Sequence, residues 1–324
     1  MKKSKLARLI AAICCFAMLL TACSSNQTSA ESGGDGSTTA DSEKKVLTYA
    51  IGAETTDLST LYMNNSLYCT SKLVYENLVD FDNGEIVPGL AESWEYNDDQ
   101  TELTFHLRQG VTFHNGEPFN AEAVKTNLEH KQSNPSFYSL KGITDIQEIE
   151  VVDEYTITLH YDHPFYAYLQ DFCWPDVNPM SAPEYIIPGD FQTISGVAGT
   201  GPYIYDEYVA GEYTRFVRNE DYWGETPYWD EIIVKYIPDS TSRLQALQTG
   251  EIDMIYGGTL LTYEEYDQAL AMDGIDGQMA EKDTRVQVIT TNATSPYLSD
   301  IRVRQAIAYA IDKEEMSVAI SNGY

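Results

Sequence analysis

Alternating apolar and polar residues predict four strands in this chain. Residues 46–53 alternate in this way and then reach a polar loop at 54–57, which is the pattern of a strand with one buried face. Similar segments predict strands at 103–108, 155–161 and 232–238. Apolar residues at helical spacing predict helices at 73–79, 121–130, 240–249 and 304–311, the third ended by Gly250. Strands and helices alternate loosely, which indicates a mixed α/β fold.

Two glycine-containing segments predict turns. Residues 199–203, Gly-Thr-Gly-Pro-Tyr, are expected to reverse the chain tightly and lead into a strand. They lack the G-x-x-x-x-G-K-[ST] spacing with which a loop binds phosphates, so nucleotide binding is not expected. Asn115-Gly116 is typical of a type I′ turn, and the aromatic pair before Gly224 is expected to pack.

The N-terminus has the layout of a secretory signal. Four basic residues precede an apolar run at 9–20, which is shorter than the roughly 20 residues that span a bilayer. The run ends in Leu20-Thr21-Ala22-Cys23, which resembles a bacterial lipobox in which Cys23 is lipidated. Residues 1–22 are then a lipoprotein signal peptide. The alternative is an ordinary cleaved signal in which the cysteine is incidental.

Residues 23–45 are predicted to form a flexible tether. They are rich in Ser, Thr, Gly and Asp and contain almost nothing apolar, so they cannot offset the entropy cost of ordering. The protein is therefore expected outside the cytoplasm, in contact with the cell membrane only through the lipid on Cys23.

The charge excludes one class of partner. The chain has 50 acidic and 20 basic residues and a net charge of −30, so it repels phosphate backbones and anionic headgroups. We expect no nucleic-acid partner.

The residues indicate neither an enzyme nor a metalloprotein. The chain has no G-x-S-x-G, S-x-x-K or H-E-x-x-H motif, and no carboxylate pair stands out as acid and base. His160 and His163 lie at a strand end and are expected to face different ways. After Cys23, the mature chain contains two cysteines, Cys69 and Cys173. They either form a disulfide or are two buried thiols, and we favour buried thiols. No catalytic residue, metal ligand or cofactor is predicted.

A series of longer motifs follows in one order between residues 46 and 320. They are Val87–Trp94, Thr101–Val111, Phe113–Ala121, Gly199–Tyr203, Arg218–Gly224, Ile237–Asp239 with Arg243, Gly250–Asp253 and Arg302–Lys313. Together they resemble the family 5 extracellular solute-binding proteins, which are the peptide- and nickel-binding components of ABC importers.

The resemblance implies a two-lobed α/β fold of the periplasmic-binding-protein type, of the large class with an extra subdomain in lobe one, around a cleft that closes by hinge motion. Lobe one with its inserted subdomain would span residues 46–280. Residues 281–324 would hold the hinge, near 282–289, and the start of lobe two. The chain corresponds to the N-terminal three fifths of a typical member, so we expect an incomplete lobe two, from a fragment or a truncated gene.

The implied function is that of a substrate-binding lipoprotein. It would capture a peptide-like solute outside the membrane and deliver it, by hinge closure, to an ABC permease and ATPase complex. Alternatives are a nickel-chelate-binding importer component, or a lipoprotein sensor or chaperone-like binder on the same fold.

The resemblance also implies ligand-binding residues in the cleft. Tyr62 lies where a cleft tyrosine is expected, Phe137 or Tyr138 lies near an aromatic wall, and Leu67 stands in place of a cleft methionine. The alternative for the three aromatic residues is packing inside lobe one.

The choice between nickel chelate and peptide depends on one segment. Residues 215–225 and 252–257 are most similar to the nickel-binding branch, which holds its metal through a small organic chelator. The arginine that would clamp the chelator's carboxylate should lie within 175–179, where there is none. Asp176 offers a negative charge there, which suits a ligand amine. The alternative is that Asp176 is a turn residue before Pro179.

Overall fold

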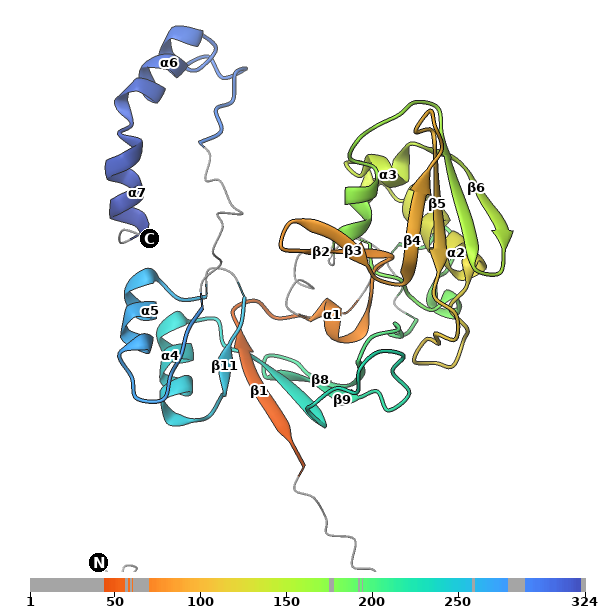
Figure 1. The fold of residues 1–324 in the computed structure, drawn as a ribbon. Coiled ribbons are helices and arrows are strands. Elements are labelled where there is room, and N and C mark those ends of the chain that lie inside the picture. The colour runs from red at the N-terminus through yellow and green to blue at the C-terminus, as the bar shows by residue number, and fades with distance from the viewer. Residues whose placement is uncertain are drawn as a thin grey trace, which may run out of the picture. The chain divides into compact units, whose positions relative to one another are not determined.

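Strands and helices mix along the chain, which confirms the α/β prediction (Figure 1). The computed structural model describes residues 44–55, 58, 60, 70–174, 178–191, 193, 195–257, 260–278 and 289–321. Within these ranges, none of the helices has the length and apolar character needed to cross a membrane.

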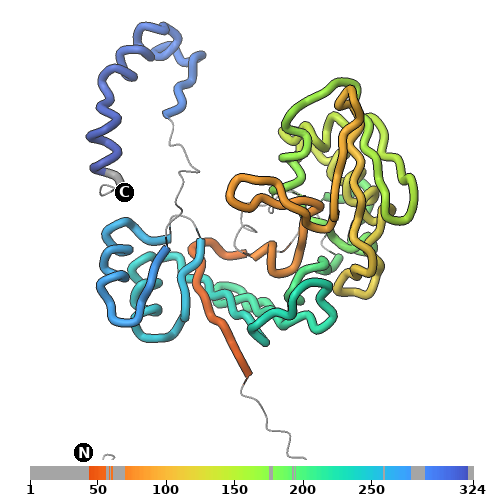
Figure 2. Tube along the Cα trace, viewed as in Figure 1, coloured from red at the N-terminus to blue at the C-terminus, as the bar shows by residue number. Residues whose placement is uncertain are grey.

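One five-stranded sheet joins distant parts of the sequence. Its strands, in spatial order, are β11 (Met254–Ile255), β1 (Val46–Ile51), β10 (Glu231–Tyr236), β9 (Tyr213–Arg218) and β8 (Tyr203–Val209). β1 is parallel to both β10 and β11, whereas β8, β9 and β10 are antiparallel. In Figure 2 the red segment of β1 lies next to the cyan segments of the later strands. β1 therefore completes a sheet whose other strands all follow residue 202.

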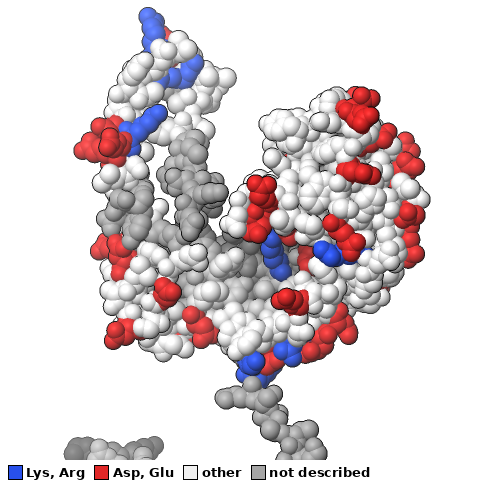
Figure 3. Space-filling view, viewed as in Figure 1, with Lys and Arg blue, Asp and Glu red and all other residues white. Residues whose placement is uncertain are grey.

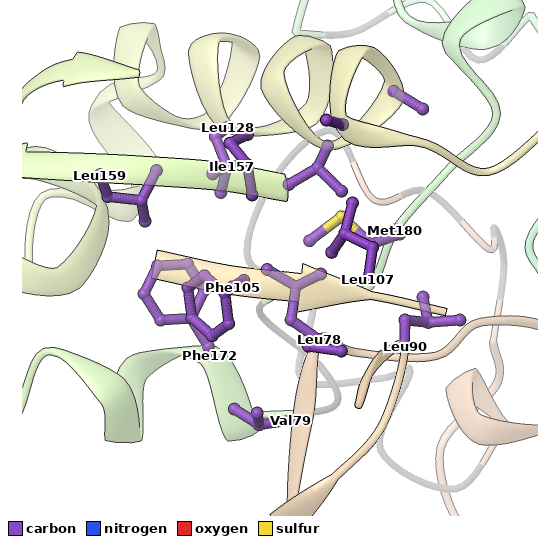
Figure 4. Packing of buried hydrophobic residues seen from close by; sticks show 14 of the residues in the cluster. Leu78, Val79, Leu90, Phe105, Leu107, Leu128, Ile157, Leu159, Phe172 and Met180 are labelled. Carbon is purple, nitrogen blue, oxygen red and sulfur yellow. The ribbon is translucent and has the colours of Figure 1, made fainter. Parts of the chain in front are cut away.

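The residues between β1 and β8 build a second, antiparallel sheet. Its order is β4 (Ala91–Tyr96), β5 (Glu102–Leu107), β7 (Thr156–Tyr161) and β6 (Ile146–Asp153), and a hairpin of β2 (Val79–Asp82) and β3 (Glu85–Pro88) precedes it. Leu103, Phe105 and Leu107 alternate on the buried face of β5. Figure 4 shows Phe105 beside Phe172, with ring centroids 5.2 Å apart. This core joins the four-stranded sheet to the 3₁₀ helix Leu169–Cys173.

Helices complete the described structure. The α-helices are α1 (Ser71–Val74), α2 (Ala121–Ser133), α3 (Lys141–Thr144), α4 (Ser240–Thr249), α5 (Tyr263–Leu270), α6 (Ile301–Ala310) and α7 (Lys313–Ser321), and the 3₁₀ helices are Pro135–Phe137, Leu169–Cys173 and Pro183–Tyr185. α2 packs on β6 and β7.

Most elements expected from the sequence are confirmed. β1, β5, β7, β10, α2, α4 and α6 all form where the hydrophobic pattern predicts them. In α4, the Asp239 side chain accepts a hydrogen bond from the Ser242 amide at 2.8 Å, and Gly250 ends the helix in the left-handed conformation with φ 72°.

The predicted helix at 73–79 is wrong. α1 ends at Val74, Tyr75 is extended, and β2 already begins at Val79. Val74 and Tyr75 are buried with the five-stranded sheet, whereas Leu78 and Val79 are buried with the four-stranded sheet. The chain crosses between two cores here. All of these apolar residues are therefore buried without sharing one helical face.

The two predicted turns differ in outcome. The prediction of a type I′ turn at Asn115-Gly116 is wrong. Such a turn needs a positive φ at both residues, and of the two only Gly116 has one. The Gly116 amide donates instead to the Phe113 carbonyl at 2.8 Å. Residues 199–203 do lead into β8. Their glycines are needed for close approach: a Cβ on Gly199 would lie 2.0 Å from the Val74 carbonyl oxygen.

Candidate functional site

The Glu76 carboxylate is the centre of a partly buried hydrogen-bond network. Its Oε1 accepts from the Tyr222 hydroxyl at 2.8 Å, and its Oε2 accepts from the Trp223 indole N–H at 2.7 Å and from the Thr200 hydroxyl at 2.8 Å. The three donors come from the glycine segment before β8 and the loop after β9. One carboxylate thus ties the segment after α1 to two segments that follow it by more than a hundred residues.

The environment of Glu76 opposes its charge. Burial raises the pKa of the Glu76 carboxyl, while the hydrogen bonds from Trp223, Tyr222 and Thr200 act to lower it. The Arg108 guanidinium lies 4.6 Å from the centroid of the Trp223 ring and orders one of these donors by a cation–π contact.

A small pocket opens beside Glu76. Its volume is about 210 Å³, and it is lined by Lys72, Tyr75, Glu76, Asn77, Asp80, Pro202 and Tyr222; we call it the Glu76 pocket. Two carboxylates and one amine line it, and the Lys72 amine is paired with Asp80 Oδ1 at 2.9 Å. Acidic side chains also predominate on the face displayed in Figure 3. The lining therefore favours neutral or cationic groups over anions.

The segment that follows the predicted cleft residue Asp176 is anchored to the same region. The Met180 amide donates to the Glu76 carbonyl at 3.0 Å. The Asn127 side chain accepts from the Ser181 amide at 2.9 Å and donates to the Ser181 carbonyl at 2.8 Å. The Lys131 amine donates to Asn178 Oδ1 at 3.0 Å and to the Pro179 carbonyl at 2.7 Å. α2 thus fixes residues 178–181.

Lys131 makes the contact between α2 and residues 178–181 pH-dependent. Its side chain is fully buried, and burial lowers the pKa of its amine from 10.5 to about 7. The neutral amine keeps two N–H groups, which match the two carbonyl oxygens that it contacts. The pKa of the Lys131 amine is lower in the folded than in the unfolded protein. Burial of Lys131 therefore lowers the free energy of unfolding most below pH 7, and this loss decreases as the pH rises above 7.

The K131M variant should therefore lack this part of the pH dependence. We expect the difference in free energy of unfolding, wild type minus K131M, to increase between pH 7 and about pH 9 by up to about 1.4 kcal/mol per pH unit. Urea unfolding of both proteins across this range measures it. Parallel stability curves would show that Lys131 does not titrate there.

The residues predicted as ligand-binding fall into two groups. Tyr62, Leu67 and Asp176, together with the lipidation candidate Cys23, lie outside the described residues. Phe137 is fully buried against Leu140 and Ile143, whereas the neighbouring Tyr138 is 75% exposed. Of these two aromatic residues, Tyr138 is therefore the one whose ring is accessible, and a role in binding stays a prediction.

His160 and His163 each contact a nearby carboxylate. His160 Nε2 contacts Glu150 Oε2 at 3.0 Å, and His163 contacts Asp162. No group of three or more His, Cys, Asp or Glu residues suited to a metal ion occurs in the described ranges. The Cys173 thiol is free, and burial raises its pKa to about 12, while Cys69 is not among the described residues.

Sequence reasoning missed the role of Glu76. It found the packing of Tyr222 and Trp223, whose rings lie 5.5 Å apart, but not the acceptor that both residues share. A glutamate between Tyr75 and Leu78, inside an otherwise buried run, was the available signal, because a buried carboxylate needs several donors.

Comparison with known proteins identifies a family. Residues 85–324 match the family described as "Bacterial extracellular solute-binding proteins, family 5 Middle". The nickel-binding periplasmic protein of Escherichia coli is 32% identical over 265 residues, which are 79% of this chain and 49% of that protein. The chain therefore spans about half the length of this relative.

Solved structures give the same result. The structure of NikA from Brucella suis in complex with Fe(III)-EDTA superposes with a TM-score of 0.76 and 32% identity, covering 86% of this chain and 56% of that one. DppA from Helicobacter pylori, in complex with the peptide STSA, has a TM-score of 0.69 and 26% identity. The match covers 86% of this chain and 59% of that one. The structural neighbours are periplasmic binding proteins, as the predicted fold class requires.

Proposed function

Because the chain belongs to the bacterial extracellular solute-binding proteins of family 5, we propose that the whole protein captures a solute outside the cytoplasm for an ABC permease and ATPase complex. The solute is released unchanged, since the proposed role is transport and not catalysis. Residues 46–280 act as the first lobe, and residues 281–324 contain the hinge and the start of the second.

We further propose that the solute is peptide-like and carries an amine. The observation that supports this choice is the lining of the Glu76 pocket, in which two carboxylates face one amine that is already paired. A chelator rich in carboxylates would meet like charges there, whereas an ammonium group would not. The relative from Helicobacter pylori was solved with a bound peptide, so the fold accommodates such a ligand.

Lipid anchoring through Cys23 belongs to the same proposal. The basic, apolar and small-residue order of residues 1–23 supports it. Incorporation of labelled palmitate into the wild type but not into C23S checks the anchor.

Binding measurements test the choice of solute. Isothermal titration of the full-length protein with short neutral and lysine-containing peptides should give saturable binding. The nickel–histidine complex should bind at least about tenfold more weakly, a difference of about 1.4 kcal/mol. Tighter binding of the nickel complex would contradict the peptide assignment and favour the nickel-chelate alternative.

A further inference from the structure

Residues 198–203 form a second point at which the chain passes between the two cores. Ala198 is buried with the four-stranded sheet, and Tyr203 is buried with the five-stranded sheet. The Gly201 amide donates to the Val74 carbonyl at 2.9 Å, so this crossing lies beside the one at residues 74–78. We call the two adjacent crossings the junction of the cores.

His114 binds the glycine-containing part of this junction. Its backbone amide donates to the Gly199 carbonyl at 2.8 Å, and its ring Nε2 lies 2.9 Å from the Gly201 carbonyl oxygen. The Thr200 hydroxyl, between these two glycines, donates to the Glu76 carboxylate. His114 therefore holds the segment from which Glu76 receives one of its three hydrogen bonds.

The Gly201 carbonyl fixes the position of the hydrogen on the His114 ring. A carbonyl oxygen can only accept, so Nε2 must carry the hydrogen that it donates to Gly201. The Asn219 side chain donates to the same oxygen at 3.1 Å. In the neutral His114 ring, Nδ1 is then an acceptor without a hydrogen.

The surroundings of Nδ1 oppose a second proton on this ring. His114 Nδ1 is buried and has no hydrogen-bond partner among the described residues. A proton on Nδ1 would therefore be a buried donor without an acceptor, and it would give the ring a positive charge. Burial lowers the pKa of the His114 ring, while the hydrogen bond to the Gly201 carbonyl acts to raise it.

The charged side chains on the neighbouring segments are bound to other groups. Their partners are as follows: Glu76 accepts from Thr200, Glu117 and Glu184 accept from Asn115, and Arg218 pairs with Asp230. In the described structure, none of these charged groups is paired with His114. A charged His114 ring would therefore lack a counter-ion.

We propose that His114 is an acid-sensitive clamp on the junction of the cores. The neutral ring holds the Gly201 carbonyl, whereas protonation of Nδ1 favours conformations in which the ring leaves this site for water. Gly201 then loses one of its two donors, and Thr200 loses the support of its segment. The junction therefore loosens in acid.

Imidazole NMR of the ¹⁵N-labelled full-length protein tests the protonation state. Long-range ¹H–¹⁵N spectra distinguish the two ring nitrogens, and the His114 ring is assigned through bonds from its own backbone amide, so the wild type suffices. We expect the hydrogen on Nε2 and a ring that is still neutral at about pH 6, where an exposed histidine is mostly protonated. A hydrogen on Nδ1, or protonation near the ordinary value of about 6.5, would overturn the clamp.

The acid dependence of unfolding tests the clamp in a second way. In H114Q, the glutamine amide can donate to Gly201 but takes up no proton. The unfolding equilibrium constant of the wild type, divided by that of H114Q, should increase by up to about tenfold for each pH unit below about 6.5. The reason is that the unfolded histidine takes up a proton which the folded one does not. Urea unfolding of both proteins between about pH 7.5 and about pH 5 measures this ratio.

The H106Q variant is the matched control. His106 is another histidine of the same sheet, with a side chain that is 45% exposed, so H106Q should keep the acid-dependent loss of the wild type. Hydrogen exchange locates the effect, because the protection of the Gly201 amide should decrease in acid in the wild type and H106Q but not in H114Q. A ratio of unfolding constants that does not change with pH, or constant protection of Gly201 in the wild type, would contradict the proposal.

Discussion

The E76A variant is expected to lose about 4 kcal/mol of its free energy of unfolding, because three donors lose one shared acceptor. The Tyr222 hydroxyl, the Trp223 indole and the Thr200 hydroxyl all point at the Glu76 carboxylate. A buried donor left without a partner costs about 1–3 kcal/mol, and here Thr200 is buried whereas Tyr222 and Trp223 are partly exposed, so water offsets part of the sum.

The E76Q variant is the matched control. Glutamine preserves the volume and one carbonyl acceptor, so its loss should be about half as large, about 2 kcal/mol. Urea unfolding of the three proteins, followed by the fluorescence of the four tryptophans, of which Trp223 is one, measures both values. Equal stability of E76A and the wild type would show that the network does not hold these segments together.

The G199A variant is expected to lose more than about 3 kcal/mol or to fail to fold. An added Cβ would lie 2.0 Å from the Val74 carbonyl oxygen and 2.8 Å from the Val74 carbonyl carbon. Both are backbone atoms at the end of α1, which is followed by the buried Tyr75, so they cannot withdraw without moving a core residue.

The G52A variant serves as the control for G199A. Its Cβ would lie 2.9 Å from Leu260 Cδ2, the tip of a flexible side chain that can move away. We expect a loss below about 1 kcal/mol, measured by thermal unfolding of both variants. A loss in G199A as small as that in G52A would contradict the close approach of the two backbone segments.

Much of the fold could be predicted because its elements follow simple patterns. β5 and β7 alternate, and α4 has an aspartate cap at one end and a glycine at the other. The failure at 73–79 has a physical cause. Periodicity records which residues are buried but not against which core, and here neighbouring residues are buried in different cores.

The candidate site was less predictable because it depends on contacts between distant residues. Glu76 meets partners more than 120 residues away, and no local pattern specifies that pairing. Lys131 occupies an ordinary helical position in the sequence, and only the fold buries it beneath residues 178 and 179. The proposed lobe boundaries and the roles of Tyr62, Leu67, Phe137, Tyr138 and Asp176 remain predictions from family resemblance.

The central claim is that the protein captures a peptide-like solute. The claim is tested most directly by mass spectrometry, with elemental analysis, of the small molecules that are released when the natively purified whole protein without its tether is denatured. We predict peptides or other amine-bearing molecules at close to one per protein, without stoichiometric metal. Stoichiometric nickel released together with an organic chelator would contradict the account.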